Sequence, residues 1–93
     1  MLADVNSTHL EYGAALSTDE LELFFTRVSG VSPIAVPRIY RSTRAAITEP
    51  FEIPSLVAAA EGFVEGPALS PDGLSLYYHK REGDTFVIYR ITR

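Results

Sequence analysis

The 93-residue sequence predicts an all-β protein built from two copies of one antiparallel unit. Three observations support this prediction. A segment near the N-terminus returns near the C-terminus with many of its residues unchanged. Within both copies, apolar and polar residues alternate, which is typical of strands with two distinct faces. The five Phe and five Tyr are also residue types that strands favour.

The repeat is found by shifting the chain along itself. Residues 15–30 align with 68–83 at a shift of 53 positions, and residues 38–44 align with 87–93 at a shift of 49. Twelve of these 23 aligned positions are identical, so chance is a poor explanation. The shift changes only between the two aligned blocks, as expected for a loop of variable length between two paired strands.

The second copy has the pattern of a turn, a strand, a turn and a second strand. "PDG" at 71–73 has the residue types of a tight turn. Residues 74–81 alternate between two faces, as in a strand. "EGD" at 82–84 turns the chain, and residues 86–93, rich in β-branched side chains, return as the partner strand.

The turn residues recur in the first copy with one difference, since Glu20 occupies the position of Gly73. If both turns share one geometry, Glu20 adopts a left-handed conformation at a cost of ~1 kcal/mol. The alternative is that the first turn is of a different type. Hydroxyl and carboxylate groups at such turns brace the chain by local hydrogen bonds. We assign this structural role to Ser17, Asp19, Ser70, Pro71, Asp72 and Gly73.

Between the copies, "FEIPSLV" at 51–57 predicts a short fourth strand. Pro54 cannot donate to a β ladder, so this strand is expected at a sheet edge. "AAAEGF" at 58–63 is the one candidate for a helix, but it is short and bounded by Pro54 and Gly62. Residues 2–8 align with the same region and predict another copy of the fourth strand.

Several motifs carry a family resemblance. "ALSPDGLSLYY" followed by "IYRITR", the degenerate "ALSTDELELFF" with "IYRSTR", and "VNS" at 5–7 resemble the Pro-Asp type of WD-like repeat in TolB-like β-propellers. The resemblance covers nearly the whole chain and implies four-stranded antiparallel blades arranged radially round a channel. It implies one blade at about 14–58 and a second at about 67–93. The second is completed by a strand from about 2–8 of the same or a neighbouring chain.

Two blades cannot close a ring alone. Both faces of a blade are apolar because each packs on a neighbour, and a soluble monomer rarely leaves several hundred Å² of such surface open. We therefore expect a larger closed propeller. The missing blades come either from head-to-tail self-assembly, with a trimer favoured, or from the rest of a longer parent chain. A distorted two-blade monomer with polar outer faces is the third alternative.

Composition excludes several classes. Without Cys the chain has neither disulfides nor thiolate metal sites. A net charge of −4 argues against a nucleic-acid partner. No apolar run approaches ~20 residues, so no membrane span is expected. No secretory signal is visible at the N-terminus, and the compartment stays undetermined.

No residue is assigned to catalysis, to a cofactor or to a metal. Ser70, Asp72 and His79 have the types of a nucleophilic triad, but the sequence has no G-x-S-x-G elbow. The same Ser and Asp recur in the first copy, where Thr26 replaces the His, so the pattern indicates turn structure. His9 and His79 have no second ligand at metal spacing. The acidic residues do not follow a calcium-loop pattern.

Four arginines at matched repeat positions are the candidate ligand or partner surface. An assembled ring of guanidinium groups could hold carboxylates or phosphates bidentately. Pairing with acidic neighbours such as Glu11, Glu22, Glu49 or Glu65 is favoured, because acidic residues outnumber basic ones. The four are Arg41, Arg44, Arg90 and Arg93.

The predicted function is a non-enzymatic scaffold or binding module for a protein or small-molecule ligand. Recognition is expected at the channel mouth and in the loop at 31–37, where the copies differ in length. The tyrosines, among them Tyr12 and Tyr77, are expected to pack between blades rather than to form a carbohydrate platform. The alternative is a propeller-borne hydrolase or lyase whose site is assembled from several blades.

Overall fold

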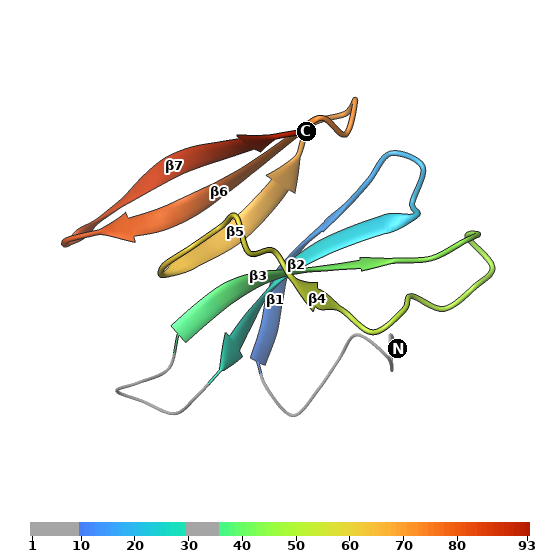
Figure 1. Cartoon of the computed structure of the whole chain (residues 1–93), viewed down its shortest axis with the longest axis horizontal. Coiled ribbons are helices and arrows are strands. Elements are labelled where there is room, and N and C mark those ends of the chain that lie inside the picture. Colours follow the sequence, from blue (N-terminus) through green and yellow to red (C-terminus); the bar gives the residue numbers. More distant parts are fainter. Residues whose placement is uncertain (1–9, 30–35) are drawn as a thin grey trace.

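The computed structural model of the chain describes residues 10–29 and 36–93, and all regular structure in these ranges is β (Figure 1). The first antiparallel sheet contains, in chain order, β1 (Leu10–Leu16), β2 (Glu22–Ser29), β3 (Val36–Thr43) and β4 (Ser55–Leu56). The second contains β5 (Val64–Leu69), β6 (Ser75–Glu82) and β7 (Thr85–Thr92). The all-β prediction is confirmed, and residues 58–63 form turns and bends instead of a helix.

The predicted fourth strand lies at the edge of the first sheet, but only its centre is a regular strand. On either side of β4 the segment still follows β3. Glu52 N donates to Thr43 O at 2.8 Å, and Val57 N donates to Ile39 O at 2.9 Å. The interruption includes Pro54, which has no N–H to give. The fourth strand predicted at 2–8 lies outside the described residues.

Each sheet begins with a strand that contains a β-bulge, at Gly13 in β1 and at Gly66 in β5. Both glycines have φ 65°, a conformation that other residues rarely adopt. Through these bulges β1 and β5 extend back to Leu10 and Val64, a few residues before the blade starts expected at about 14 and 67. A Cβ added at Gly13 would lie 3.6 Å from Gly66 Cα, so the two sheets approach closely here.

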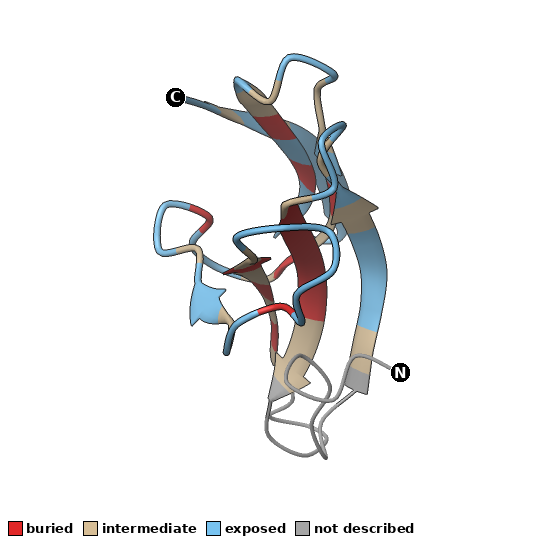
Figure 2. Ribbon diagram, turned by 90° about the vertical axis from the view of Figure 1, so that its right-hand side faces the viewer, coloured by how far each residue is buried: buried red, intermediate tan, exposed pale blue. Residues whose placement is uncertain are grey.

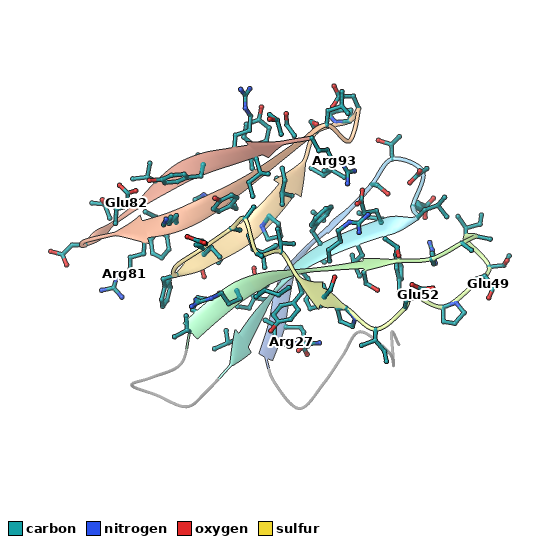
Figure 3. All side chains as sticks on the ribbon, viewed as in Figure 1. Arg27, Glu49, Glu52, Arg81, Glu82 and Arg93 are labelled. Atoms are coloured by element: carbon teal, nitrogen blue, oxygen red, sulfur yellow. The ribbon has the colours of Figure 1, made fainter. Side chains whose placement is uncertain are left out.

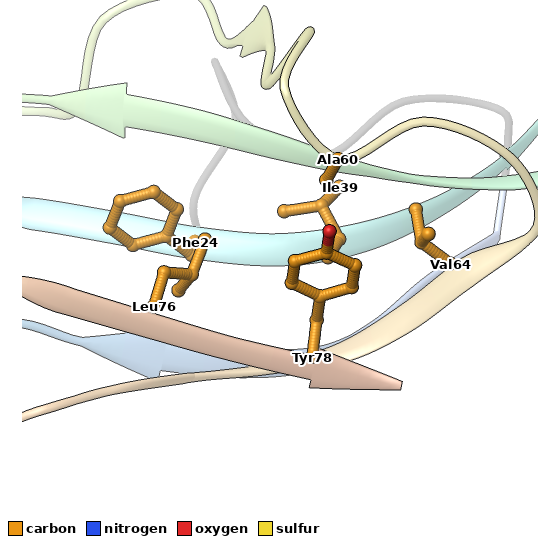
Figure 4. Close-up of a cluster of buried hydrophobic side chains, with 6 residues drawn as sticks. All are labelled: Phe24, Ile39, Ala60, Val64, Leu76 and Tyr78. Atoms are coloured by element: carbon orange, nitrogen blue, oxygen red, sulfur yellow. The ribbon is translucent and has the colours of Figure 1, made fainter. Parts of the chain in front are cut away.

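The main core lies between the two sheets (Figure 4). The first sheet faces it with Phe24 and Ile39, and the second with Val64, Leu76 and Tyr78. The linking residue Ala60 completes the cluster, and all six side chains are buried. Burial of such side chains contributes roughly 1.5–3 kcal/mol each before conformational entropy is subtracted. The core therefore joins the sheets into one unit.

The two sheets use opposite faces for this contact. In the repeat alignment Phe24 corresponds to Tyr77, whereas Leu76 corresponds to Leu23. Phe24 faces the junction in the first sheet, but its counterpart Tyr77 points away from the junction in the second. The arrangement is therefore head-to-tail, with one face of each sheet turned outward.

The two outward faces differ in burial. On the first sheet, Leu23, Phe25 and Tyr40 are packed with Phe51 from the segment before β4, and we call this the covered outer face. On the second sheet, Tyr77, Phe86 and Ile88 are exposed, and we call this the open outer face. Figure 2 shows the same contrast, since β2 carries the longest run of buried residues and β7 carries none. The expectation of apolar outer faces is met on both sheets, but only one is uncovered.

Candidate functional site

The Asp-containing turns of the two copies have the same internal hydrogen bonds. In the first, Ser17 Oγ donates to Asp19 at 2.6 Å, Leu21 N donates to Asp19 at 3.0 Å, and Glu22 N donates to Ser17 Oγ at 3.0 Å. The corresponding bonds in the second turn, residues 70–75, measure 2.6, 3.0 and 2.9 Å. The serine and aspartate side chains therefore form hydrogen bonds within their own turns, as expected for a structural role.

The backbone of the two turns also matches. Glu20 has φ 63° and Gly73 has φ 73°, so Glu20 adopts the left-handed conformation that a shared geometry requires. The turns lie side by side, because Thr18 Oγ1 donates to Pro71 O at 2.9 Å. The hydrogen bond from Ser17 is the first cause that lowers the pKa of Asp19. Ser70 lowers the pKa of Asp72 in the same way.

Glu22 is the centre of a charged cluster beside these turns. Its carboxylate is buried at the start of β2, where it accepts a hydrogen bond from Arg41 Nε on β3. Arg93 donates to both of its oxygens, from Nη1 at 2.6 Å and Nη2 at 2.5 Å, and so links the second sheet to the first (Figure 3). The Arg93 hydrogen bond is the main cause that lowers the pKa of Glu22, against the effect of burial. The same bond raises the pKa of Arg93.

The four candidate arginines therefore separate into different environments. Arg41 and Arg93 meet at Glu22. Arg44 places its guanidinium 4.3 Å from the centre of the Phe51 ring. Arg90 is exposed and has no ion pair or side-chain hydrogen bond within residues 10–29 and 36–93. The structure brings two of the four together at an acidic partner, and it forms no common guanidinium surface within this chain.

Arg44 and Arg93 share one contact that the repeat explains. Arg44 Nε donates to Glu20 O at 2.8 Å, and Arg93 Nε donates to Gly73 O at 2.7 Å. Glu20 and Gly73 are the left-handed residues of the two turns. Each arginine thus holds the carbonyl of its own turn and extends its guanidinium beyond it. The two guanidinium groups then meet different neighbours, an aromatic ring in one case and a carboxylate in the other.

A pocket of about 280 Å³ lies between β4 of the first sheet and the end of β7. Its walls are mostly apolar, and Arg41 and Arg93 provide its charged side. This volume is near the lower end of small-molecule pockets, which start at about 300 Å³. The apolar lining residues are Phe24, Leu56, Val57, Leu69, Leu74, Leu76 and Ile91. Sequence reasoning missed this pocket, because its lining residues come from both sheets and meet only when the sheets pack together.

The residue types of a catalytic triad are not assembled in the described chain. Ser70 is bound to Asp72, and no hydrogen bond between Ser70 and His79 occurs in the described ranges. His79 lies on β6 opposite Glu65, with Nδ1 only 2.9 Å from the place that a Cβ on Gly66 would take. His9 lies outside the described residues. Within those residues no group of three His, Asp or Glu is placed to hold a metal ion.

Some of the tyrosines pack against or bond to other side chains, and others lie on the surface. Tyr78 and Tyr89 stack with ring centres 5.9 Å apart beside the core. Tyr12 donates its hydroxyl hydrogen to Glu65 and so joins β1 to β5. Burial first, and then this hydrogen bond, raises the pKa of Tyr12 to about 12. Tyr77 instead lies on the open outer face.

Comparison of the chain with protein-family models, with curated proteins and with solved structures found no match. Residues 31–35 of the loop expected to recognise a ligand lie outside the described ranges. Where the chain is described, no helix is long and apolar enough to cross a membrane. The candidate functional features are therefore the open outer face, the free side of β7 and the pocket beside it.

Proposed function

We propose that the chain is a non-enzymatic β-propeller scaffold or binding module whose two sheets act as neighbouring blades. The observation that supports this proposal is a difference in exposure between equivalent positions of the two sheets. Phe24 and Ile39 are 4 % and 0 % exposed where the first sheet meets the second. Their counterparts in the second sheet, Tyr77 and Ile88, are 39 % and 66 % exposed. The second sheet thus presents, uncovered, the positions that the first sheet uses to bind its neighbour.

A further sheet of the same kind is the occupant that this face fits. The contact inside the chain supports this choice, because Phe24 and Ile39 of the first sheet pack there against Leu76 and Tyr78 of the second. Covering the open face would remove apolar area from water at roughly 25 cal/mol per Å². It would also cover Tyr77, Phe86 and Ile88, which the chain leaves exposed.

The source of that sheet is a second copy in head-to-tail order, with three chains forming six blades, or the remaining blades of a longer chain. In the self-assembled case the open outer face meets the first sheet of the next copy. There the segment that covers the first sheet itself exposes Ile47 and Ile53, so both surfaces contribute apolar side chains. A ring of this kind would bring Arg90 from each copy to equivalent positions for a protein or small-molecule ligand.

Sedimentation velocity and light scattering over a concentration series test the proposal. We expect a mass of several chains, with three favoured. The variant Ile88→Lys, on the open outer face, should shift the mass towards the monomer. Val87→Lys is the matched control, since Val87 is a partly exposed residue on the other face of the same strand. A folded chain that stays monomeric and soluble at its highest concentration would contradict self-assembly, as would equal effects of the two variants.

A further inference from the structure

The two sheets differ at the free side of their third strand. In the first sheet, the segment 51–57 lies along β3, whereas no described segment lies along β7. Because β3 and β7 occupy the same repeat position, the first sheet shows what the free side of β7 can accept. The comparison can be made for the main chain and for one large side chain.

Corresponding residues of β7 and β3 direct their backbone N–H and C=O groups to the same side of the strand. Arg44 N donates to Leu21 O at 3.0 Å, and Arg93 N donates to Leu74 O at 2.9 Å. In an antiparallel ladder, alternate residues direct their N–H and C=O groups to opposite sides. Ile88 and Thr92 therefore direct theirs away from β6, as Ile39 and Thr43 direct theirs away from β2. In the first sheet, Ile39 O and Thr43 O accept from Val57 N and Glu52 N.

The large side chain is Phe51. It is buried against Leu23 and Phe25, with the Arg44 guanidinium over its ring. The counterparts of Leu23, Phe25 and Arg44 in the second sheet are Leu76, Tyr78 and Arg93. Two of these counterparts, Leu76 and Arg93, line the 280 Å³ pocket. The pocket therefore lies beside positions that would contact a residue equivalent to Phe51.

We infer that the free side of β7 and the adjoining pocket form an acceptor site for an extended peptide with the chemistry of residues 51–57. The peptide pairs its main chain with Ile88 O and Thr92 O and places a large apolar side chain in the pocket. Such strand addition takes its affinity from main-chain hydrogen bonds and its specificity from the pocket. The inference rests on the proposed function and deepens it by naming a partner for the free side of β7.

The test uses the whole chain and a labelled synthetic peptide of residues 50–58, followed by fluorescence anisotropy. We expect saturable binding, weakened roughly tenfold or more when the peptide carries Phe51→Ala. N-methylation at Val57 removes the N–H that would bond to Ile88 O and should abolish binding. N-methylation at Leu56 is the matched control, because that N–H points away from the acceptor strand and its loss should change little.

Amide chemical shifts locate the bound peptide. The inference predicts changes at Ile88, Arg90 and Thr92, with those at Ile39 and Thr43 unchanged. Changes at Ile39 and Thr43 would instead mean that the peptide replaces the segment of the chain already there, and this result would overturn the inference. Absence of binding, or equal binding of all four peptides, would overturn it too. The mass of the chain without peptide tests the proposed function separately, so either proposal can fail alone.

Discussion

The covered outer face and the open outer face are formed by strands of similar sequence, but their apolar side chains differ in burial. Phe25 on the covered face lies beneath Arg27, whose guanidinium is 5.4 Å from its ring centre and 4.7 Å from that of Tyr40. Phe51 adds a second ring beneath a second arginine. On the open face, Ile88 has no comparable cover in the described residues and is mostly exposed. A short irregular segment with one aromatic residue, together with two arginines, thus covers the outer face of the first sheet.

This contrast teaches that the two ends of the molecule are not equivalent. The covered end buries its apolar residues within the chain, with cation–π contacts of roughly 0.5–2 kcal/mol each. The open end retains the residue types that form the junction between the sheets. A partner sheet would therefore cover apolar side chains at the open end that the chain itself leaves exposed.

The largest effect is expected from removing an aromatic ring on the covered face. Phe25→Ala should lower the free energy of unfolding by about 3–5 kcal/mol, because the ring is buried and leaves a cavity. Tyr77→Ala on the open face should cost less than about 1 kcal/mol in the monomer. Urea denaturation at a low protein concentration measures both. Equal losses for the two variants would show that the faces do not differ in solution.

The next effect concerns Glu22, whose counterpart in the second sheet is Ser75. Glu22→Gln should destabilise the chain by about 1 kcal/mol, a modest value because Arg41 and Arg93 are each more than 40 % exposed at the side chain. The exposed Glu49→Gln is the control and should change nothing. If the Glu22→Gln variant is as stable as the parent chain at pH 7, the prediction is contradicted, because the Glu22 carboxylate then does not help to hold the sheets together.

The same carboxylate gives a pH dependence. Arg93 lowers the pKa of Glu22 from its ordinary value of 4.5, so the stabilisation is complete above that pH. It is lost as the pH falls from 4.5 through the lower pKa of the folded state. The difference in stability between the parent chain and Glu22→Gln should therefore shrink below pH 4.5. A difference that grows on acidification would contradict this sign.

The smallest effect is expected at the paired turns. Glu20→Gly should stabilise the chain by about 0.5–1 kcal/mol, because glycine adopts φ 63° without a Cβ clash. Gly73→Ala should destabilise it by about 1 kcal/mol, because alanine meets the same strain at φ 73°. Thermal unfolding of both variants is the measurement. Opposite signs are required if the two turns share one conformation.

Local sequence was sufficient to predict the turns and the longer strands. The residue types at Asp19 and Asp72 specify their hydrogen bonds within a few neighbours, and strand alternation follows directly from the side-chain period. The expected strands at 74–81 and 86–93 are observed at Ser75–Glu82 and Thr85–Thr92. The alignment of Glu20 with a glycine left two alternatives open, a left-handed residue or a different turn, and the structure has the left-handed one.

The contacts between segments could not be predicted in the same way. Nothing local in "FEIPSLV" states that Phe51 covers Leu23, because that contact depends on the path of an irregular segment over the sheet. Likewise, the contact of both Arg41 and Arg93 with Glu22 could not be predicted without knowing the relative position of the two sheets. Glu22 was one of four acidic partners that the sequence offered, and only the position of Arg93, just past the end of β7, at the start of β2 separates it from the others.

The bulge glycines have a geometric consequence for the ring proposed above. Thr26 Oγ1 accepts a hydrogen bond from Gly66 N at 3.0 Å, so main chain meets side chain with little space between them. Elsewhere the larger core side chains Phe24, Leu76 and Tyr78 lie between the sheets, and we infer that the pair has the shape of a wedge. The angle of a wedge fixes how many copies complete a circle. A bulkier residue at Gly13 would widen the narrow end, flatten the arc and raise the number of sectors needed to close it.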